Sequence, residues 1–222
     1  MNPKQGVFSF EKNSRFDIGD FVEDESNAEA LRWLMAWANW PNHRLNIYGN
    51  YACGKSHLAK LWANYVNAYI VTDSNLSIRE LLIKYRAFLI DPIEPLISQN
   101  EDWLFDFLNI CAEENASILM VSSTTEFDKY TSLKDLLSRL NATSHVRILQ
   151  PNDNLLKKII KKIGSDLGIW IKPSVIEYII NHTNRDIENI TLLLDQVNQI
   201  SLINKKPIEI KMIKDVIDSK SL

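Results

Sequence analysis

The sequence predicts an α/β protein in which a parallel sheet flanked by helices is followed by an all-helical domain. Up to residue 151, short β-favouring runs alternate with helix-length segments, and this alternation is typical of a parallel sheet with helices on its faces. From residue 152 onward, apolar residues recur at helical spacing. We therefore expect an N-terminal tail over residues 1–15, an α/β domain over 16–151 and a helical domain over 152–222.

Composition places the chain among globular proteins and excludes several classes. Of its 222 residues, 45% are hydrophobic and 24% are charged, close to the globular average. The net charge of -3 provides no basic field to gather nucleic acid or coat an anionic membrane. Cys53 and Cys111 form no CxxC pair, and no signal peptide or bilayer-spanning apolar run occurs. We expect a cytoplasmic protein with no membrane segment, disulfide framework or zinc site.

The expected elements follow in chain order. Ser26 can cap a first helix whose apolar residues recur at helical spacing until Pro41 ends it. Runs rich in β-branched and aromatic residues then predict strands at 45–48, 69–72, 87–90, 118–122 and 146–149. Pro173 and Pro207 separate the helices of the last part, which are expected at 155–167, 174–181, 187–203 and 210–217.

A phosphate-binding motif lies between the first expected strand and the helix that follows it. The match to G-x-x-x-x-G-K-[ST] consists of Gly49, Asn50, Tyr51, Ala52, Cys53, Gly54, Lys55 and Ser56, and His57 follows directly. In this context backbone N–H groups cradle phosphate oxygens, Lys55 neutralises phosphate charge and Ser56 holds Mg²⁺. The motif therefore predicts ADP or ATP with Mg²⁺ as cofactors. Ala52 stands where many such loops have glycine, and its Cβ is expected to reduce nucleotide affinity.

Asp91 follows the expected strand 87–90. This would place its carboxylate beside the loop, where Mg²⁺ needs an oxygen ligand; the alternative is an ordinary polar residue that ends a buried strand. Vigorous ATPases usually place a second acid directly afterwards, but here Pro92 follows and Glu94 is the nearest downstream carboxylate. We expect a weak ATPase at best.

Several motifs together resemble the DnaA family of AAA+ ATPases, and more closely its short, Hda-type members, over nearly the whole chain. These motifs are Asp20-Phe21-Val22 with Ser26-Asn27, Trp40-Pro41, Ser56-His57-Leu58-Ala59, Ile90-Asp91, Leu136-Leu137-Ser138-Arg139-Leu140 and Arg185-Asp186-Ile187-Glu188. The resemblance implies an AAA+ module with a helical lid domain. It also implies a regulator that, bound to ADP and tethered to the polymerase sliding clamp, makes ATP-bound DnaA hydrolyse its nucleotide and so prevents re-initiation. DnaA carries a further DNA-binding domain beyond its lid, so no sequence-specific DNA binding is expected here.

The resemblance assigns roles to two arginines. Arg139 looks like the arginine finger, which is presented in trans to the γ-phosphate of a neighbouring subunit; a surface salt bridge is the alternative. Arg185 is similar to the sensor 2 arginine of the lid. Asn184 is expected to cap the next helix, which would leave Arg185 in a first turn that disfavours a cation unless phosphate is near. The alternative is a solvated arginine offset by Asp186 and Glu188.

Three further sites rest on the same resemblance. Ser122 falls at the sensor 1 position, and Ser123 or Thr124 would serve as well. Phe21 and Val22 occupy the region that contacts adenine, where ordinary core packing is the alternative. In the tail, a degenerate clamp-binding peptide with Gln5, Phe8 and Phe10 would bind the DNA polymerase III β sliding clamp; the alternatives are an unremarkable terminus and a strand packed on the fold.

Two other functions stay open. A helicase loader of the DnaC or IstB kind would bind single-stranded DNA with a steep salt dependence, which the acidic charge balance does not favour. An interaction protein with a dead nucleotide site is compatible with Ala52 and Pro92. The sequence also leaves the oligomeric state open, including a homo-oligomer.

Overall fold

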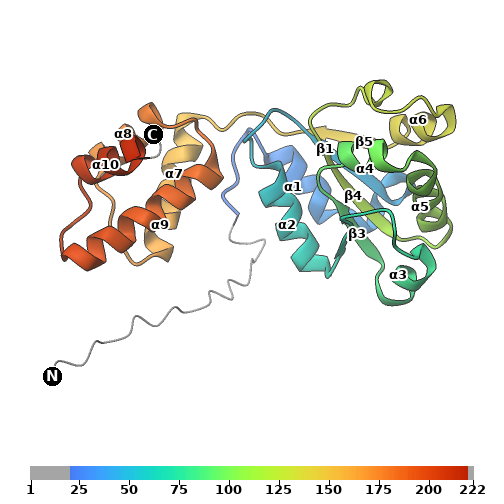
Figure 1. Ribbon diagram of the computed structural model, residues 1–222, viewed down its shortest axis with the longest axis horizontal. Helices are drawn as coiled ribbons and strands as arrows, with labels where there is room; N and C mark the ends of the chain where they lie inside the picture. Colours follow the sequence, from blue (N-terminus) through green and yellow to red (C-terminus); the bar gives the residue numbers. More distant parts are fainter. Residues whose placement is uncertain (1–20, 220–222) are drawn as a thin grey trace.

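A computed structural model describes residues 21–219. Within them, five parallel strands form one sheet in the order β2-β3-β4-β1-β5, which confirms the predicted architecture (Figure 1). Their bounds are Arg44–Tyr48 for β1, Tyr69–Ile70 for β2, Ala87–Ile90 for β3, Ser117–Ser122 for β4 and Ser144–Arg147 for β5. The last strand begins two residues earlier than predicted. Its polar residue Ser144 already pairs with Leu45, and the apolar pattern gives no sign of that pairing.

Helices cover both faces of the sheet. On one face, α1 (Ala28–Met35) and α2 (Lys55–Val66) pack on the strands through a cluster that includes Leu34 and Trp62. The opposite face carries α3 (Ile78–Lys84), α4 (Glu94–Gln99), α5 (Glu101–Glu113) and α6 (Lys134–Asn141). Short 3₁₀ turns lie at Trp37–Asn39, Pro41–His43 and Phe127–Lys129.

The start of the first helix differs from the prediction. Asn27, not Ser26, is the N-cap residue of α1. The carbonyl of Ser26 accepts a hydrogen bond from Leu149 N at 3.0 Å, and its buried hydroxyl has no partner within the described chain. Ser26 therefore joins the first segment to the end of the sheet. The helix also ends at Met35, before Pro41, because the chain turns there into the two 3₁₀ turns.

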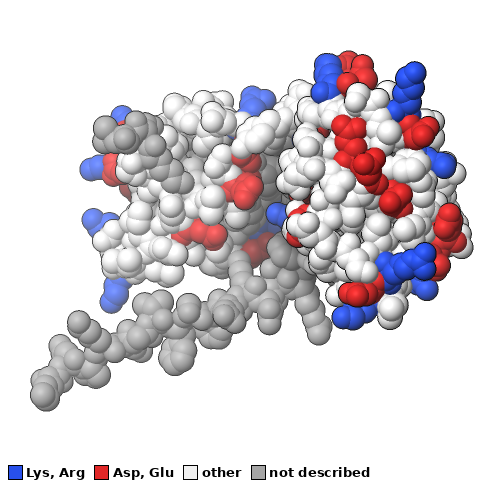
Figure 2. All heavy atoms as spheres, turned by 45° about the vertical axis from the view of Figure 1, so that its right-hand side comes forward, with Lys and Arg blue, Asp and Glu red and all other residues white. Residues whose placement is uncertain are grey.

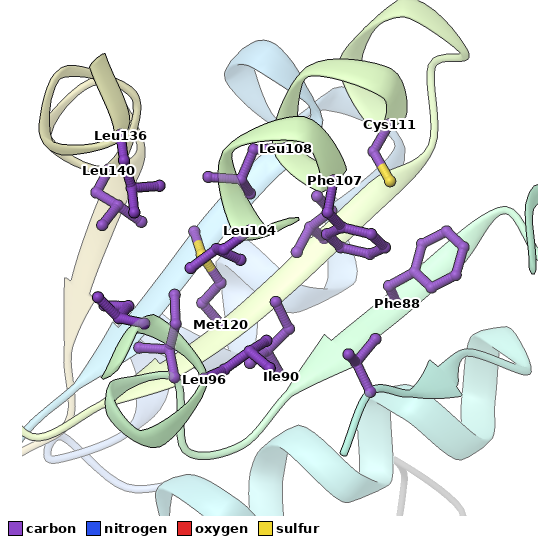
Figure 3. Packing of buried hydrophobic residues seen from close by; sticks show 14 of the residues in the cluster. Phe88, Ile90, Leu96, Leu104, Phe107, Leu108, Cys111, Met120, Leu136 and Leu140 are labelled. Atoms are coloured by element: carbon purple, nitrogen blue, oxygen red, sulfur yellow. The ribbon is translucent and has the colours of Figure 1, made fainter. Parts of the chain in front are cut away.

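Aromatic packing fixes α5 on the second face of the sheet. Phe107 meets Phe88 of β3 edge to face, with ring centroids 5.2 Å apart (Figure 3). Trp103 stacks on Phe107 with ring centroids 5.0 Å apart. Such pairs contribute about 0.5–1.5 kcal/mol each beyond the burial of their area. Leu136 and Leu140 attach α6 to the same cluster.

The C-terminal helices form a unit with its own core. They are α7 (Asp153–Asp166), α8 (Pro173–His182), α9 (Ile187–Asn204) and α10 (Ile210–Ser219), and they lie beside the α/β part in Figure 1. The side chain of Asn152 caps α7 by accepting a hydrogen bond from Leu155 N at 2.8 Å. Between residues 21 and 219, no helix has the length and apolar character needed to cross a membrane.

Candidate functional site

The phosphate-binding motif forms a tight loop between β1 and α2, as predicted. A Cβ at Gly49 would come within 2.4 Å of the Ile148 carbonyl oxygen, so this position excludes every side chain. Gly54 is the N-cap of α2 and has a φ of 95°, a conformation that strongly favours glycine. The motif glycines therefore lie where backbone geometry requires them.

Ala52 adopts a φ of 60°, in the left-handed region. A residue with a Cβ pays about 1–2 kcal/mol for this conformation. The structure thus shows the strain expected from an alanine at this place in the loop.

The last two residues of the loop motif lie close to polar partners. The Lys55 ammonium donates to the carbonyl oxygens of Gly49 at 2.9 Å and Asn50 at 2.7 Å. The Ser56 hydroxyl donates to Asp91 Oδ1 at 3.1 Å. A serine oxygen, a carboxylate and an ammonium therefore converge at the carboxyl ends of β1 and β3, and these groups could bind Mg²⁺ and phosphate oxygens.

Asp91 is partly buried at this edge. Burial raises the pKa of its carboxyl group above the ordinary value, while the Ser56 hydrogen bond and the charges of Lys60 and Lys55 act in the opposite direction. Glu94 raises the pKa further. A cation bound here would favour the charged carboxylate and offset this penalty.

Glu94 is held away from the role of a free catalytic base. Its Oε1 accepts hydrogen bonds from Ser123 N at 2.6 Å and from Ser123 Oγ at 2.7 Å. This contact ties the start of α4 to the end of β4. Sequence reasoning noted Glu94 but could not place Ser123 beside it.

The three candidates for sensor 1 have different environments. Ser122 is 1% exposed, accepts a hydrogen bond from Asn46 Nδ2 at 2.9 Å and donates to the Thr124 carbonyl at 2.7 Å. Ser123 is exposed and donates to Glu94. Thr124 is partly buried. In this conformation the Ser122 hydroxyl is therefore bonded both to Asn46 of β1 and to the segment that follows β4.

The segment that precedes α1 reaches the first turn of α2. The rings of Phe21 and His57 stack with centroids 6.1 Å apart. Val22 is partly buried, and its carbonyl accepts a hydrogen bond from Asn27 Nδ2 at 3.1 Å. Phe21 thus lies beside the first turn of α2, directly after the loop.

Arg185 lies outside the helix in which it was expected. Asp186 is the N-cap of α9 and accepts a hydrogen bond from Glu188 N at 3.0 Å, so the expected cap by Asn184 is wrong. Arg185 has a φ of 58°, and its Nη2 lies 2.9 Å from Asp153 Oδ1 of α7. Sequence reasoning missed Asp153, because an acidic residue in a first turn looks like ordinary helix capping.

The lid helices touch the loop side of the α/β part. The side chain of Ile187 in α9 is 3.7 Å from the position that a Cβ would take on Gly54. Asp24 accepts a hydrogen bond from Asn152 Nδ2 at 3.1 Å and lies 3.9 Å from the Lys158 ammonium. Both the α/β part and the lid therefore border the loop. A ligand bound at the loop can contact both parts.

Arg139 lies apart from these contacts, in the last turn of α6. It is exposed, and within residues 21–219 it forms no ion pair, which differs from the salt bridge held open as an alternative. The clamp-binding candidates Gln5, Phe8 and Phe10 fall outside the described residues.

Comparisons with known sequences agree with this organisation. Residues 153–217 match the family described as "Hda, lid domain". The chromosomal replication initiator protein DnaA of Flavobacterium psychrophilum is 23% identical over 233 residues, covering 93% of this chain and 49% of that protein. DnaA of Spiroplasma citri is 24% identical over 235 residues, covering 90% and 52% respectively. The chain thus spans about half the length of the curated relatives it matches.

Solved structures with the same fold include parts of two initiators. Domain III of the Thermotoga maritima replication initiation protein DnaA superposes with a TM-score of 0.77 at 18% identity, covering 93% of this chain and 97% of that chain. AMPPCP-bound DnaA from Aquifex aeolicus gives a TM-score of 0.73 at 15% identity, covering 94% and 70%. At sequence identities of 18% and 15%, the structural similarity shows that the fold is shared.

Proposed function

Because this chain is a DnaA-related AAA+ protein with an Hda-type lid domain, we propose that it regulates the initiation of replication by stimulating hydrolysis of DnaA-bound ATP. It does so with the polymerase sliding clamp, and it binds ADP or ATP with Mg²⁺ at its own loop. The observation that carries this proposal is the exposed Arg139, whose guanidinium is not engaged in an ion pair within the described chain. A guanidinium available at the surface can enter a site on another protein.

The proposed mechanism uses two sites, the nucleotide-binding loop and Arg139. The nucleotide bound at Lys55 and Ser56 fixes the arrangement of the α/β part and the lid, because the loop borders both. Arg139 enters the site of DnaA, where it stabilises the charge that develops on the γ-phosphate during hydrolysis. Intrinsic hydrolysis stays weak, since Pro92 follows Asp91 and Glu94 is bonded to Ser123.

The direct test measures DnaA-bound nucleotide. DnaA from the same organism is loaded with radiolabelled ATP, and its conversion to ADP is followed with and without this protein, and with and without clamp loaded on DNA. Acceleration that requires both components supports the proposal. If clamp and DnaA are shown to be active and no acceleration occurs, the proposal is wrong.

An adaptor with a dead nucleotide site is the second candidate. The observations in its favour are the strained Ala52 and the engagement of Lys55 with the loop's own carbonyls. Isothermal titration with ADP and ATP separates the two functions, because the adaptor gives no binding heat. A helicase loader has less support: positive and negative side chains are intermixed on the face shown in Figure 2, without a continuous basic surface for single-stranded DNA.

Replacing Ala52 with glycine is expected to strengthen ADP binding by about 2- to 5-fold, because glycine tolerates a positive φ and leaves room for phosphate near the backbone. Calorimetric titration measures the change. Ala52→Val is the matched control and should weaken binding, since a β-branched residue resists this conformation. Equal affinities of all three proteins would show that the loop strain does not limit nucleotide binding.

Replacing Asp153 with asparagine is expected to raise ATP affinity by about 2- to 5-fold, because it removes the exposed ion pair that a phosphate must displace from Arg185. Glu177→Gln is the control: it breaks the ion pair with Lys157 and makes the same charge change on the lid. If both variants gain equally, the effect comes from net charge and does not involve Arg185.

A further inference from the structure

Arg44 is a buried charge that the nucleotide site does not use. It opens β1 at the amino edge of the sheet, and its residue surface is 3% exposed. Its Nε and Nη1 are buried and have no hydrogen-bond partner in the described chain. Within residues 21–219 it also forms no ion pair. Buried guanidinium groups normally have a partner, because an unpaired buried charge strongly destabilises the folded state.

Arg139 is the neighbouring charge. Leu45 pairs with Ser144, so Arg44 is level with Thr143 on the adjacent segment. The Thr143 hydroxyl donates to the carbonyl of Arg139 at 3.1 Å, which ties the end of α6 to this level of the sheet. The start of β1 at Arg44 and the end of α6 at Arg139 therefore lie at one corner of the α/β part.

The surroundings of Arg44 disfavour its positive charge. Burial, and then the charge of Arg139, lower the pKa of Arg44 below its ordinary value, with Cys111 acting in the opposite direction. Cys111 supplies no anion at neutral pH, because burial raises the pKa of its thiol to about 12. Arg44 and Arg139 are thus two neighbouring positive charges, of which the first is buried and the second is exposed.

We propose that Arg139 and Arg44 form a phosphate-binding site at the amino end of β1, with Arg139 in contact with the phosphoryl oxygens and Arg44 as the buried charge behind it. A phosphoryl group carries about two negative charges near neutral pH, as a phosphate ester does, and so matches two guanidinium groups better than a single carboxylate. Repulsion from Arg44 also holds Arg139 away from the sheet and toward solvent. This inference rests on the proposed function in one respect: the phosphoryl group belongs to the nucleotide on the partner.

Arg44 is a positioning residue in this account, and its effect depends on charge. Arg44→Met is expected to weaken phosphate binding at Arg139 by about 5- to 10-fold, since a charge in a poorly screened position acts over several ångströms. Arg44→Lys should stay within about 2-fold of the wild type, because it keeps the charge. The methionine variant should fold at least as stably as the wild type, because it removes an unpaired buried charge.

The experiment uses nitrogen-15 NMR of arginine Nε–H groups in a Lys55→Ala background, so that the loop does not compete for the probe. Inorganic phosphate is titrated at constant ionic strength, and acetate serves as the carboxylate source. A saturable shift of the Arg139 signal with phosphate, weakened by Arg44→Met and kept by Arg44→Lys, is the expected result. The absence of saturation, an unchanged affinity in Arg44→Met, or equally tight acetate binding would overturn the proposal. Arg44→Gln provides the same comparison if the methionine variant does not fold.

The hydrolysis assay separates this inference from the proposed function. If the wild type accelerates DnaA-bound ATP hydrolysis and Arg44→Met accelerates it equally, the role of Arg44 is refuted while the proposed function stands. If the wild type accelerates nothing, the proposed function fails, and the NMR titration still decides whether the phosphate site exists.

Discussion

Replacing Arg139 with alanine is expected to abolish the stimulated hydrolysis of DnaA-bound ATP while this protein still folds and binds nucleotide. Removing an arginine finger lowers the rate by about 10³- to 10⁵-fold, because no other group supplies its charge to the transition state. Arg139 is exposed on α6, whose attachment to the sheet depends on Leu136 and Leu140. The substitution should therefore leave the fold intact. The measurement is the rate of ADP formation on DnaA in the presence of clamp on DNA.

Two control variants make this result specific. Arg139→Lys keeps the charge but loses the planar fork that binds phosphate oxygens in pairs, so partial activity is expected. Lys134→Ala removes an exposed charge from the first turn of the same helix and should have little effect. Full stimulation by Arg139→Ala would refute the role of Arg139 in trans.

Replacing Lys55 with alanine is expected to weaken binding of ADP and ATP by about 100-fold, because charge-assisted hydrogen bonds to phosphate contribute about 1.5–3 kcal/mol each. The lysine lies at the loop, where its ammonium already reaches the Gly49 and Asn50 carbonyls. Isothermal titration measures the affinities directly.

Lys84→Ala is the matched control for this prediction. Lys84 is exposed in the last turn of α3, on the opposite face of the sheet from α2, and the substitution removes the same charge. We expect the affinity of this variant for ADP and ATP to differ from the wild-type value by less than about 3-fold, as is usual for an exposed charge. Equal losses in both variants would indicate a general electrostatic effect, and unchanged binding in Lys55→Ala would place the nucleotide elsewhere or exclude it.

The sequence by itself determined the loop and the fold class. The motif from Gly49 to Ser56 is contiguous, so its residue types specify the local backbone without help from distant parts of the chain. The buried strands are also contiguous in the sequence, so their apolar runs predict them directly. The prediction placed β5 two residues too late in the sequence. The first residues of this strand, Ser144 and His145, are polar and pair with β1 only in the assembled sheet.

Only the tertiary structure decided which distant residues meet. Strand β4 lies between β1 and β3, and this order brings Glu94 to Ser123. Packing of α7 against α9 within the lid sets Arg185 against Asp153. The closed fold also buries Nε and Nη1 of Arg44 without a hydrogen-bond partner among residues 21–219. In the sequence, a single arginine before an apolar run looks like a solvated residue. The physical reason is that local sequence fixes dihedral preferences and apolar faces, whereas contacts between side chains depend on how those faces close around the sheet.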